Sequence, residues 1–121
     1  METITINNET YVKLAEVEKL LPATNADNEE YCIIRTYSAG VFAGYIESRD
    51  GKEAVIRNAR RIWYWYGAAS LSQLATDGTA NPDKCKFPCA VDKVILTEVI
   101  EIIPCTKKAK ESIEGVPVWK M

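Results

Sequence analysis

The stretch EAVIRNARRIWYWYGAASLSQL, from Glu53 to Leu74, decides the fold expected for this chain. It opens with β-branched residues, gathers three arginines and four large aromatics, and breaks at Gly67. β-Branched and aromatic residues are enriched in strands, and glycine often marks where a strand is interrupted. We therefore predict a strand from Glu53 to Tyr66, and a short helix over residues 70–77 that begins after Ser70 as N-cap.

Side chains alternate between the two faces of a strand, so this segment predicts two groups. One face would carry Arg57, Arg61, Trp63 and Trp65, and the other Asn58, Arg60, Tyr64 and Tyr66. Either face places a guanidinium beside an aromatic surface, an arrangement that suits a planar anion. The alternative is that the aromatics form the core or a subunit interface and the arginines are its solvated rim.

The flanking sequence predicts an α+β fold with an antiparallel sheet as its core. YCIIRTY (31–37) and VFAGYIES (41–48) read as two strands, and Asp50-Gly51 is a strong hairpin signal before the third. Strands joined by short turns form an antiparallel meander. VILTEVIEII (94–103) predicts one further strand, residues 106–114 a second short helix, and residues 116–119 an edge strand.

The first thirty residues predict an N-terminal helical arm. A short strand is expected at Thr3–Ile6, and apolar residues from Tyr11 to Leu21 recur at helical spacing up to Pro22. Residues 24–30 are polar and read as a linker or mobile loop. We expect two parts: the arm and linker at 1–30, and a single α+β domain at 31–121.

Composition narrows the function classes. The 121 residues carry a formal net charge of −2, whereas a general nucleic-acid coat needs a basic excess, so nucleic acid is an unlikely partner. A local basic cluster in a mildly acidic chain favours a small anionic ligand. No apolar run approaches the length that spans a bilayer, and the first residues do not resemble a signal peptide. We expect a cytoplasmic protein without a membrane partner.

The residues that carry most enzyme chemistry are missing or badly spaced. The chain has no histidine, which removes the commonest general base. Its four cysteines are Cys32, Cys85, Cys89 and Cys105, and the spacing of Cys85 and Cys89 is not that of a usual zinc knuckle. We expect buried thiols, no metal, no cofactor and no enzymatic activity.

From Tyr31 to Lys120 the sequence resembles an uncharacterised family of small bacteriophage and prophage proteins. The matching motifs are RTYSAGVFAG, NARRIWYWYGAASLSQLA, KCKFPCAVDKVILTEVIEIIPCT and VPVWK. The resemblance implies a phage-borne protein in the cytoplasm of an infected bacterium. Small accessory phage proteins without catalytic signatures include inhibitors of host defence. Among these are sponge proteins that counter Thoeris and cyclic-oligonucleotide signalling, and the chain looks similar to them in kind.

Together, these observations predict an anti-defence protein that sequesters a host nucleotide-type immune signal, a cyclic ADP-ribose derivative or cyclic oligonucleotide, without cleaving it. The expected ligand-binding residues are Arg57, Arg60, Arg61, Trp63 and Trp65, with Arg35 and Tyr37 from a neighbouring strand and Lys107 and Lys108 from another subunit. The alternative is a phage accessory protein that binds a host protein through the same surface. The surplus of aromatic side chains, which includes Trp119, predicts a homo-oligomer.

Overall fold

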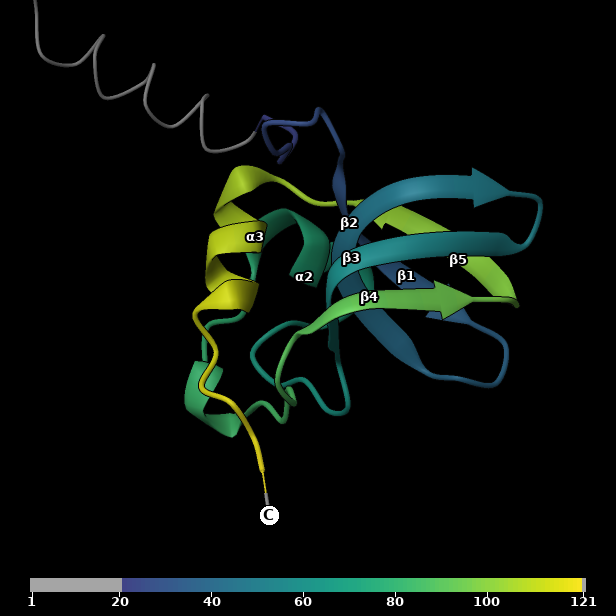
Figure 1. Cartoon of the computed structure of the whole chain (residues 1–121). Coiled ribbons are helices and arrows are strands. Elements are labelled where there is room, and N and C mark those ends of the chain that lie inside the picture. Colours follow the sequence, from purple (N-terminus) through teal and green to yellow (C-terminus); the bar gives the residue numbers. More distant parts are fainter. Residues whose placement is uncertain (1–20, 121) are drawn as a thin grey trace, which may run out of the picture.

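The protein has the predicted α+β architecture, a five-stranded antiparallel sheet with two short helices beside it (Figure 1). A computed structural model describes residues 21–120. Its elements are β1 (Tyr31–Thr36), β2 (Val41–Asp50), β3 (Glu53–Arg61), α2 (Leu71–Asp77), the 3-10 turn η1 (Pro82–Lys84), β4 (Val91–Leu96), β5 (Val99–Pro104) and α3 (Lys107–Glu114). The strand expected at Thr3–Ile6 and the arm helix expected from Tyr11 lie outside the described residues.

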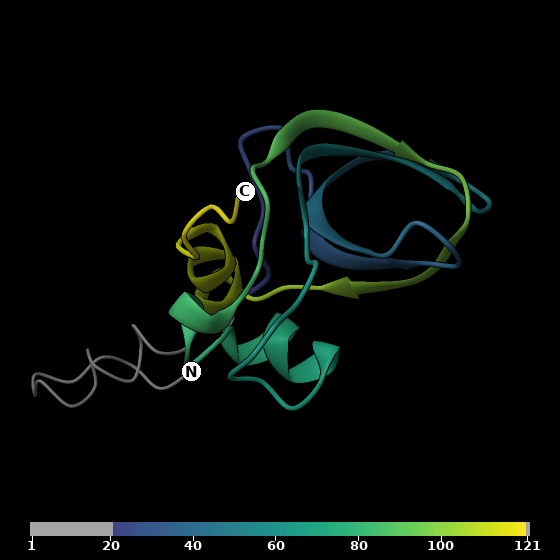
Figure 2. The same ribbon diagram turned by 90° about the horizontal axis from the view of Figure 1, so that it is seen from below.

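The sheet has the strand order β4-β3-β2-β1-β5 and curls strongly, as Figure 2 shows end-on. The strands β4 and β5 are consecutive in sequence yet lie at opposite edges of the sheet. Leu96 and Val99, on either side of the corner between them, are both buried. The corner is held by hydrogen bonds from Val99 N to the Lys52 carbonyl (2.9 Å) and from Tyr37 N to the Glu98 carbonyl (2.9 Å). The prediction of a single strand over 94–103 is therefore wrong.

Two apolar clusters lie on the two faces of β1, so nearly every residue of this strand is buried. Cys32 and Ile34 point into the curl of the sheet with Phe42 and Ile56. Tyr31 and Ile33 point the other way, into a cluster that includes side chains of both helices. β1 is thus the central element, covered on both sides.

A bulge in β3 changes which side chains share a face. Tyr45 pairs with Arg57, but Ala43 pairs with Arg60, so two residues of β3 face the single Gly44 of β2. Asn58 is in this bulge with φ of 51°, in the left-handed region that asparagine tolerates better than most residues. The expected grouping is therefore wrong: Arg57 and Arg60 share one face, and Arg61 lies on the other, opposite Phe42.

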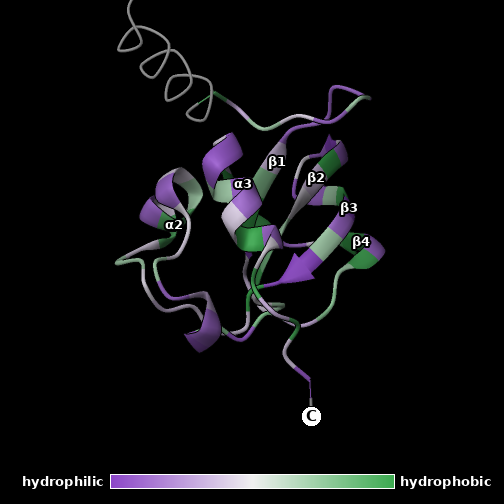
Figure 3. Ribbon diagram, turned by 90° about the vertical axis from the view of Figure 1, so that its left-hand side faces the viewer, coloured by the Kyte–Doolittle hydropathy of each residue, from purple (hydrophilic) through white to green (hydrophobic). Residues whose placement is uncertain are grey.

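The strand also ends earlier than predicted. β3 stops at Arg61, where the purple arrowhead in Figure 3 marks its hydrophilic end. The aromatics that follow form only an isolated bridge, between Tyr64 and Lys86. Val118 likewise makes a single parallel bridge to Phe87, so the edge strand expected at 116–119 is reduced to one contact.

Both short helices begin and end where the capping residues predicted. Ser70 accepts a hydrogen bond from Gln73 N, and Thr106 accepts one from Ala109 N. The helices are also tied to each other, because Thr106 Oγ1 donates to the Thr76 carbonyl at 2.7 Å. Figure 1 shows the two helices on the same side of the sheet.

Residues 24–30, expected as a linker or mobile loop, form a turn before β1, and none of them is buried. Ala23 is buried, and its backbone exchanges hydrogen bonds with Cys105 and Tyr31. The following turn is closed by Asn25 Oδ1, which accepts from the backbone of Asp27 and Glu29. An asparagine that bonds its own following backbone is a common turn device.

Candidate functional site

The structure separates most of the predicted ligand-binding residues. Arg57 lies near Glu47 and Asp27, with nitrogen–oxygen distances of 3.6 and 4.0 Å. Arg35 lies 3.4 Å from Glu101 on the adjacent strand. These side chains are engaged in surface ion pairs on different parts of the sheet, and they do not converge on one ligand.

The remaining predicted positions outside the aromatic segment are dispersed as well. Tyr37 is 76% exposed in the turn after β1. Lys107 and Lys108 are exposed in the first turn of α3. Among the described residues, no aromatic stack joins any of these three side chains to Trp63, and no ion pair joins any of them to Arg57.

Arg60 has a structural role. Its side chain is only 6% exposed, and its nitrogens donate to three backbone carbonyls: Nε to Pro88 (2.9 Å), Nη1 to Ile113 (2.8 Å) and Nη2 to Phe87 (3.1 Å). The guanidinium also lies 5.5 Å from the Phe87 ring centre. Burial lowers the pKa of this guanidinium from its ordinary value. Arg60 therefore joins β3 to the segment before β4 and to the end of α3.

Arg61 is exposed but held in place. It donates to the Ala39 carbonyl, and its guanidinium carbon lies 4.4 Å from the centre of the Phe42 ring. The predicted pairing of Arg61 with the tryptophans is absent, because the bulge turns Arg61 to the Phe42 face.

The aromatic residues after β3 do form a surface, together with residues that sequence reasoning did not assign to the site. Trp63 is 64% exposed and stacks on Trp119, with ring centres 6.4 Å apart and planes only 7° from parallel. The Lys86 ammonium lies 5.7 Å from the Trp119 ring centre and 5.9 Å from that of Tyr64. We call Trp63, Tyr64, Lys86 and Trp119 the aromatic–lysine surface.

The backbone holds these four residues in register. Lys86 exchanges hydrogen bonds with Tyr64, and Trp119 N donates to the Phe87 carbonyl at 3.0 Å. A second pair of the same kind lies beside it, with Lys84 Nζ 5.0 Å from the Tyr66 ring centre. Trp65, between the two tyrosines, turns inward and packs against the main apolar cluster. Of the two predicted tryptophans, Trp63 is thus exposed and Trp65 is partly buried.

This arrangement suits binding better than catalysis. An exposed indole offers a flat apolar face, and the lysine ammonium beside it offers a positive charge already positioned against an aromatic ring. The signal in the sequence was the pair of lysines that flank Cys85: both lysines are exposed, whereas Cys85 is buried.

The buried thiols of Cys32 and Cys105 are poorly suited to act as nucleophiles. Burial raises the pKa of Cys32 and of Cys105 to about 12, which keeps both protonated. All four cysteines are free, and only Cys89 is exposed. Within residues 21–120, no three His, Cys, Asp or Glu side chains are grouped to hold a metal ion. In the same range, no helix has the length and apolarity to cross a membrane.

Comparison with known proteins gives a family but no activity. The family model described as "Domain of unknown function (DUF6948)" matches residues 29–113. No curated protein and no solved structure matches the chain.

Proposed function

Because the chain belongs to the DUF6948 family, a domain of unknown function, we propose its role from the candidate site. The protein binds a planar anionic ligand of the nucleotide type on the aromatic–lysine surface and releases it chemically unchanged. The observation that carries this proposal is the near-parallel stack of Trp63 on Trp119 with the Lys86 ammonium beside it. A base can stack on the exposed indole while its phosphate meets the lysine.

The expected energies are sufficient for specific binding. Stacking of one base on an aromatic side chain contributes about 1–3 kcal/mol. A hydrogen bond to a charged group contributes about 1.5–3 kcal/mol. The Lys84–Tyr66 pair adjacent to the surface provides a second ammonium and a second ring for a ligand with two nucleotide units. The ordering cost is small, since the backbone of both segments is already hydrogen bonded.

The biological role that we propose follows from the sequence resemblance. A phage-encoded protein in the cytoplasm of an infected bacterium would sequester a host immune signal, either a cyclic ADP-ribose derivative or a cyclic oligonucleotide. Sequestration requires binding alone, in keeping with a chain that has no histidine.

A second candidate function is binding to a host protein. Exposed Trp63 and Val118 would suit a protein partner as well as a nucleotide, because tryptophan is enriched at the centres of interfaces. The two candidate functions differ in the bound ligand: a nucleotide-binding protein would hold a small molecule, whereas a protein that binds only a host protein would hold none.

We also propose that the protein is a homo-oligomer. Ile95 on β4 and Ile100 on β5 are large apolar side chains that are more than half exposed. Exposed apolar patches commonly mark interfaces. These strands are the two edges of the sheet, where a second copy has access to them.

Mass spectrometry of released ligands tests the binding proposal. The protein is exposed to a mixture of cyclic dinucleotides, cyclic trinucleotides and ADP-ribose derivatives, washed, and heated to release what it holds. We expect one compound of unaltered mass. A hydrolysed or linearised product would indicate an enzyme, whereas a blank across the whole mixture would favour the host-protein function.

A further inference from the structure

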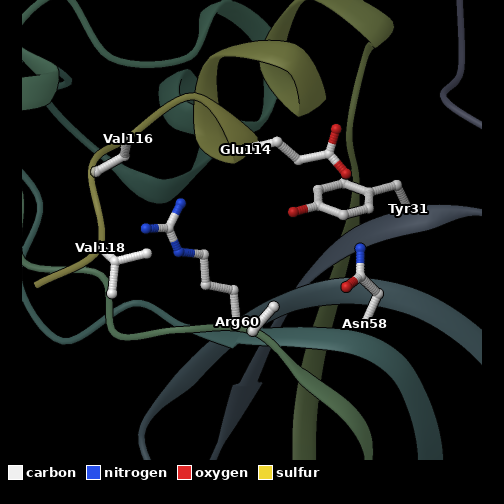
Figure 4. Close-up of a pocket in the computed structure, with 7 residues that line it drawn as sticks. Tyr31, Asn58, Arg60, Glu114, Val116 and Val118 are labelled. Carbon is white, nitrogen blue, oxygen red and sulfur yellow. The ribbon is translucent and has the colours of Figure 1, made fainter.

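A cavity of about 250 Å³ lies between β1, β3, the end of α3 and the segment after it. Its walls are formed by Tyr31, Asn58, Arg60, Ala90, Glu114, Val116 and Val118 (Figure 4). None of these residues is part of the aromatic–lysine surface. Tyr31, Arg60 and Val116 are buried, whereas Asn58, Glu114 and Val118 are exposed at the rim.

Arg60 brings a positive charge to this cavity that the described residues do not neutralise. The guanidinium has five N–H groups, and the three carbonyls of Pro88, Phe87 and Ile113 use one each, which leaves two. Within residues 21–120, no carboxylate lies within ion-pair distance of Arg60. The nearest acid on the cavity wall, Glu114, is paired instead with Lys110 at 3.1 Å.

Tyr31 brings a hydroxyl to the same cavity. The residue is only 1% exposed, and its side chain forms part of the cavity wall. Figure 4 shows the hydroxyl pointing into the cavity toward Arg60, while the Glu114 carboxylate points away from Arg60. Burial raises the pKa of Tyr31 above its ordinary value, so the hydroxyl keeps its proton and remains a donor.

Asn58 completes the set. The bulge in β3 places its amide at the rim of the cavity, below the Tyr31 ring in Figure 4. A charged donor, a hydroxyl and an amide thus border one small space, an arrangement that suits an anionic acceptor.

We propose that this cavity binds a small carboxylate, with its oxygens accepting from Arg60, Tyr31 and Asn58 and its apolar part against Val116 and Val118. A guanidinium and a carboxylate are matched in shape as well as charge. A phosphate is a poorer occupant, because it carries more negative charge and Glu114 lies on the same wall. The apolar side chains of the wall also favour an organic acid over an inorganic ion.

Calorimetric or NMR titration of the full chain tests this proposal. The probes are butyrate and benzoate, the neutral amides butyramide and benzamide, and inorganic phosphate. We expect the carboxylates to bind at least about tenfold more tightly than their amides, since a charged hydrogen bond is replaced by a neutral one. Absence of carboxylate binding, equal binding of the amides, or tighter binding of phosphate would each overturn the proposal.

Variants that spare the structural bonds of Arg60 locate the site. Tyr31→Phe keeps the buried ring and removes only the hydroxyl, and we expect carboxylate binding to weaken about tenfold. Asn58→Gly keeps the positive φ and removes the amide, and binding should weaken severalfold. Tyr37→Phe, which loses an exposed hydroxyl beyond the other end of β1 and outside the cavity wall, is the matched control and should bind normally. Unchanged binding in both cavity variants would place the carboxylate elsewhere and refute the assignment.

Discussion

Arg60 Nη1 lies 2.8 Å from the carbonyl oxygen of Ile113 and so joins the end of β3 to the last turn of α3. The contact satisfies a carbonyl at a helix C-terminus, where the dipole also favours a positive charge. An arginine in an aromatic-rich segment would ordinarily be assigned to a ligand. In this chain it holds together the elements on which the aromatic–lysine surface is built.

Replacement of Arg60 should therefore reduce stability more than any other change to a charged residue of β3. Arg60→Met removes three hydrogen bonds from a buried guanidinium to backbone carbonyls, and we expect the free energy of unfolding to fall by about 3 kcal/mol or more. Urea denaturation followed by circular dichroism measures the loss. Arg57→Met, which removes only exposed ion pairs, is the control, with an expected loss below about 1 kcal/mol. Equal losses in the two variants would contradict the structural role of Arg60.

Gly44 should be intolerant of even one added methyl group. A Cβ on Gly44 would lie 2.5 Å from Ile56 Cγ2 and 2.9 Å from the Arg57 carbonyl oxygen, because the bulge brings β3 close to β2 at this point. We expect Gly44→Ala to destabilise the protein by about 1–3 kcal/mol, as overpacking usually does. A thermal unfolding midpoint equal to that of the parent protein would show that the bulge is absent.

At Asn58, in contrast to Gly44, we expect some substitutions to be tolerated. With φ at 51°, glycine fits this position without strain, whereas valine does not. We expect Asn58→Gly to change stability by less than about 0.5 kcal/mol and Asn58→Val to cost about 1–3 kcal/mol. Chemical denaturation of the two variants side by side is sufficient. Equal stability of both variants would argue for an ordinary strand conformation at Asn58.

Stability should decline above about pH 9, because the buried thiols of Cys32 and Cys105 resist ionisation in the folded state. The pKa of Cys32 and of Cys105 rises from an ordinary 9.0 to about 12 on burial. The unfolded chain therefore loses these protons first, so the contribution is complete below pH 9 and is lost as the pH rises toward 12. Urea titrations across this range should show the fall, and Cys105→Ala should make it shallower. A stability independent of pH over the range would contradict the burial of both thiols.

Local signals in the sequence predicted much of the fold. The Asp50-Gly51 turn, the caps Ser70 and Thr106, and the glycines that end both helices are short-range features, and the structure has each where it was expected. The corner between β4 and β5 was missed because Thr97 and Glu98 carry no turn signature. β-Branched residues occur on both sides of this corner, so the segment reads as one strand. The break arises because the curled sheet places β4 and β5 at opposite edges.

The candidate site was predicted only in part, for a related reason. The prediction assumed that side chains alternate between faces without interruption along β3. The bulge at Asn58 shifts this alternation, so Arg60 and Arg61 lie on the faces opposite to those predicted. Trp63 was expected to share a face with Trp65, whereas it stacks on Trp119, at the far end of the chain. The burial of Arg60 depends on three backbone carbonyls from two distant segments, and no sequence pattern records such contacts.

The central claim is that the aromatic–lysine surface binds a planar anionic ligand. Its most direct test is a titration of the parent protein and three variants with the compound that mass spectrometry identifies, followed by tryptophan fluorescence and confirmed by equilibrium dialysis. Trp63→Ala and Lys86→Ala should each weaken binding roughly tenfold or more, since stacking and the charged contact contribute about 1–3 kcal/mol apiece. Tyr37→Ala, an equally exposed aromatic outside the surface, should bind like the parent protein. Normal affinity in both Trp63→Ala and Lys86→Ala would contradict the account.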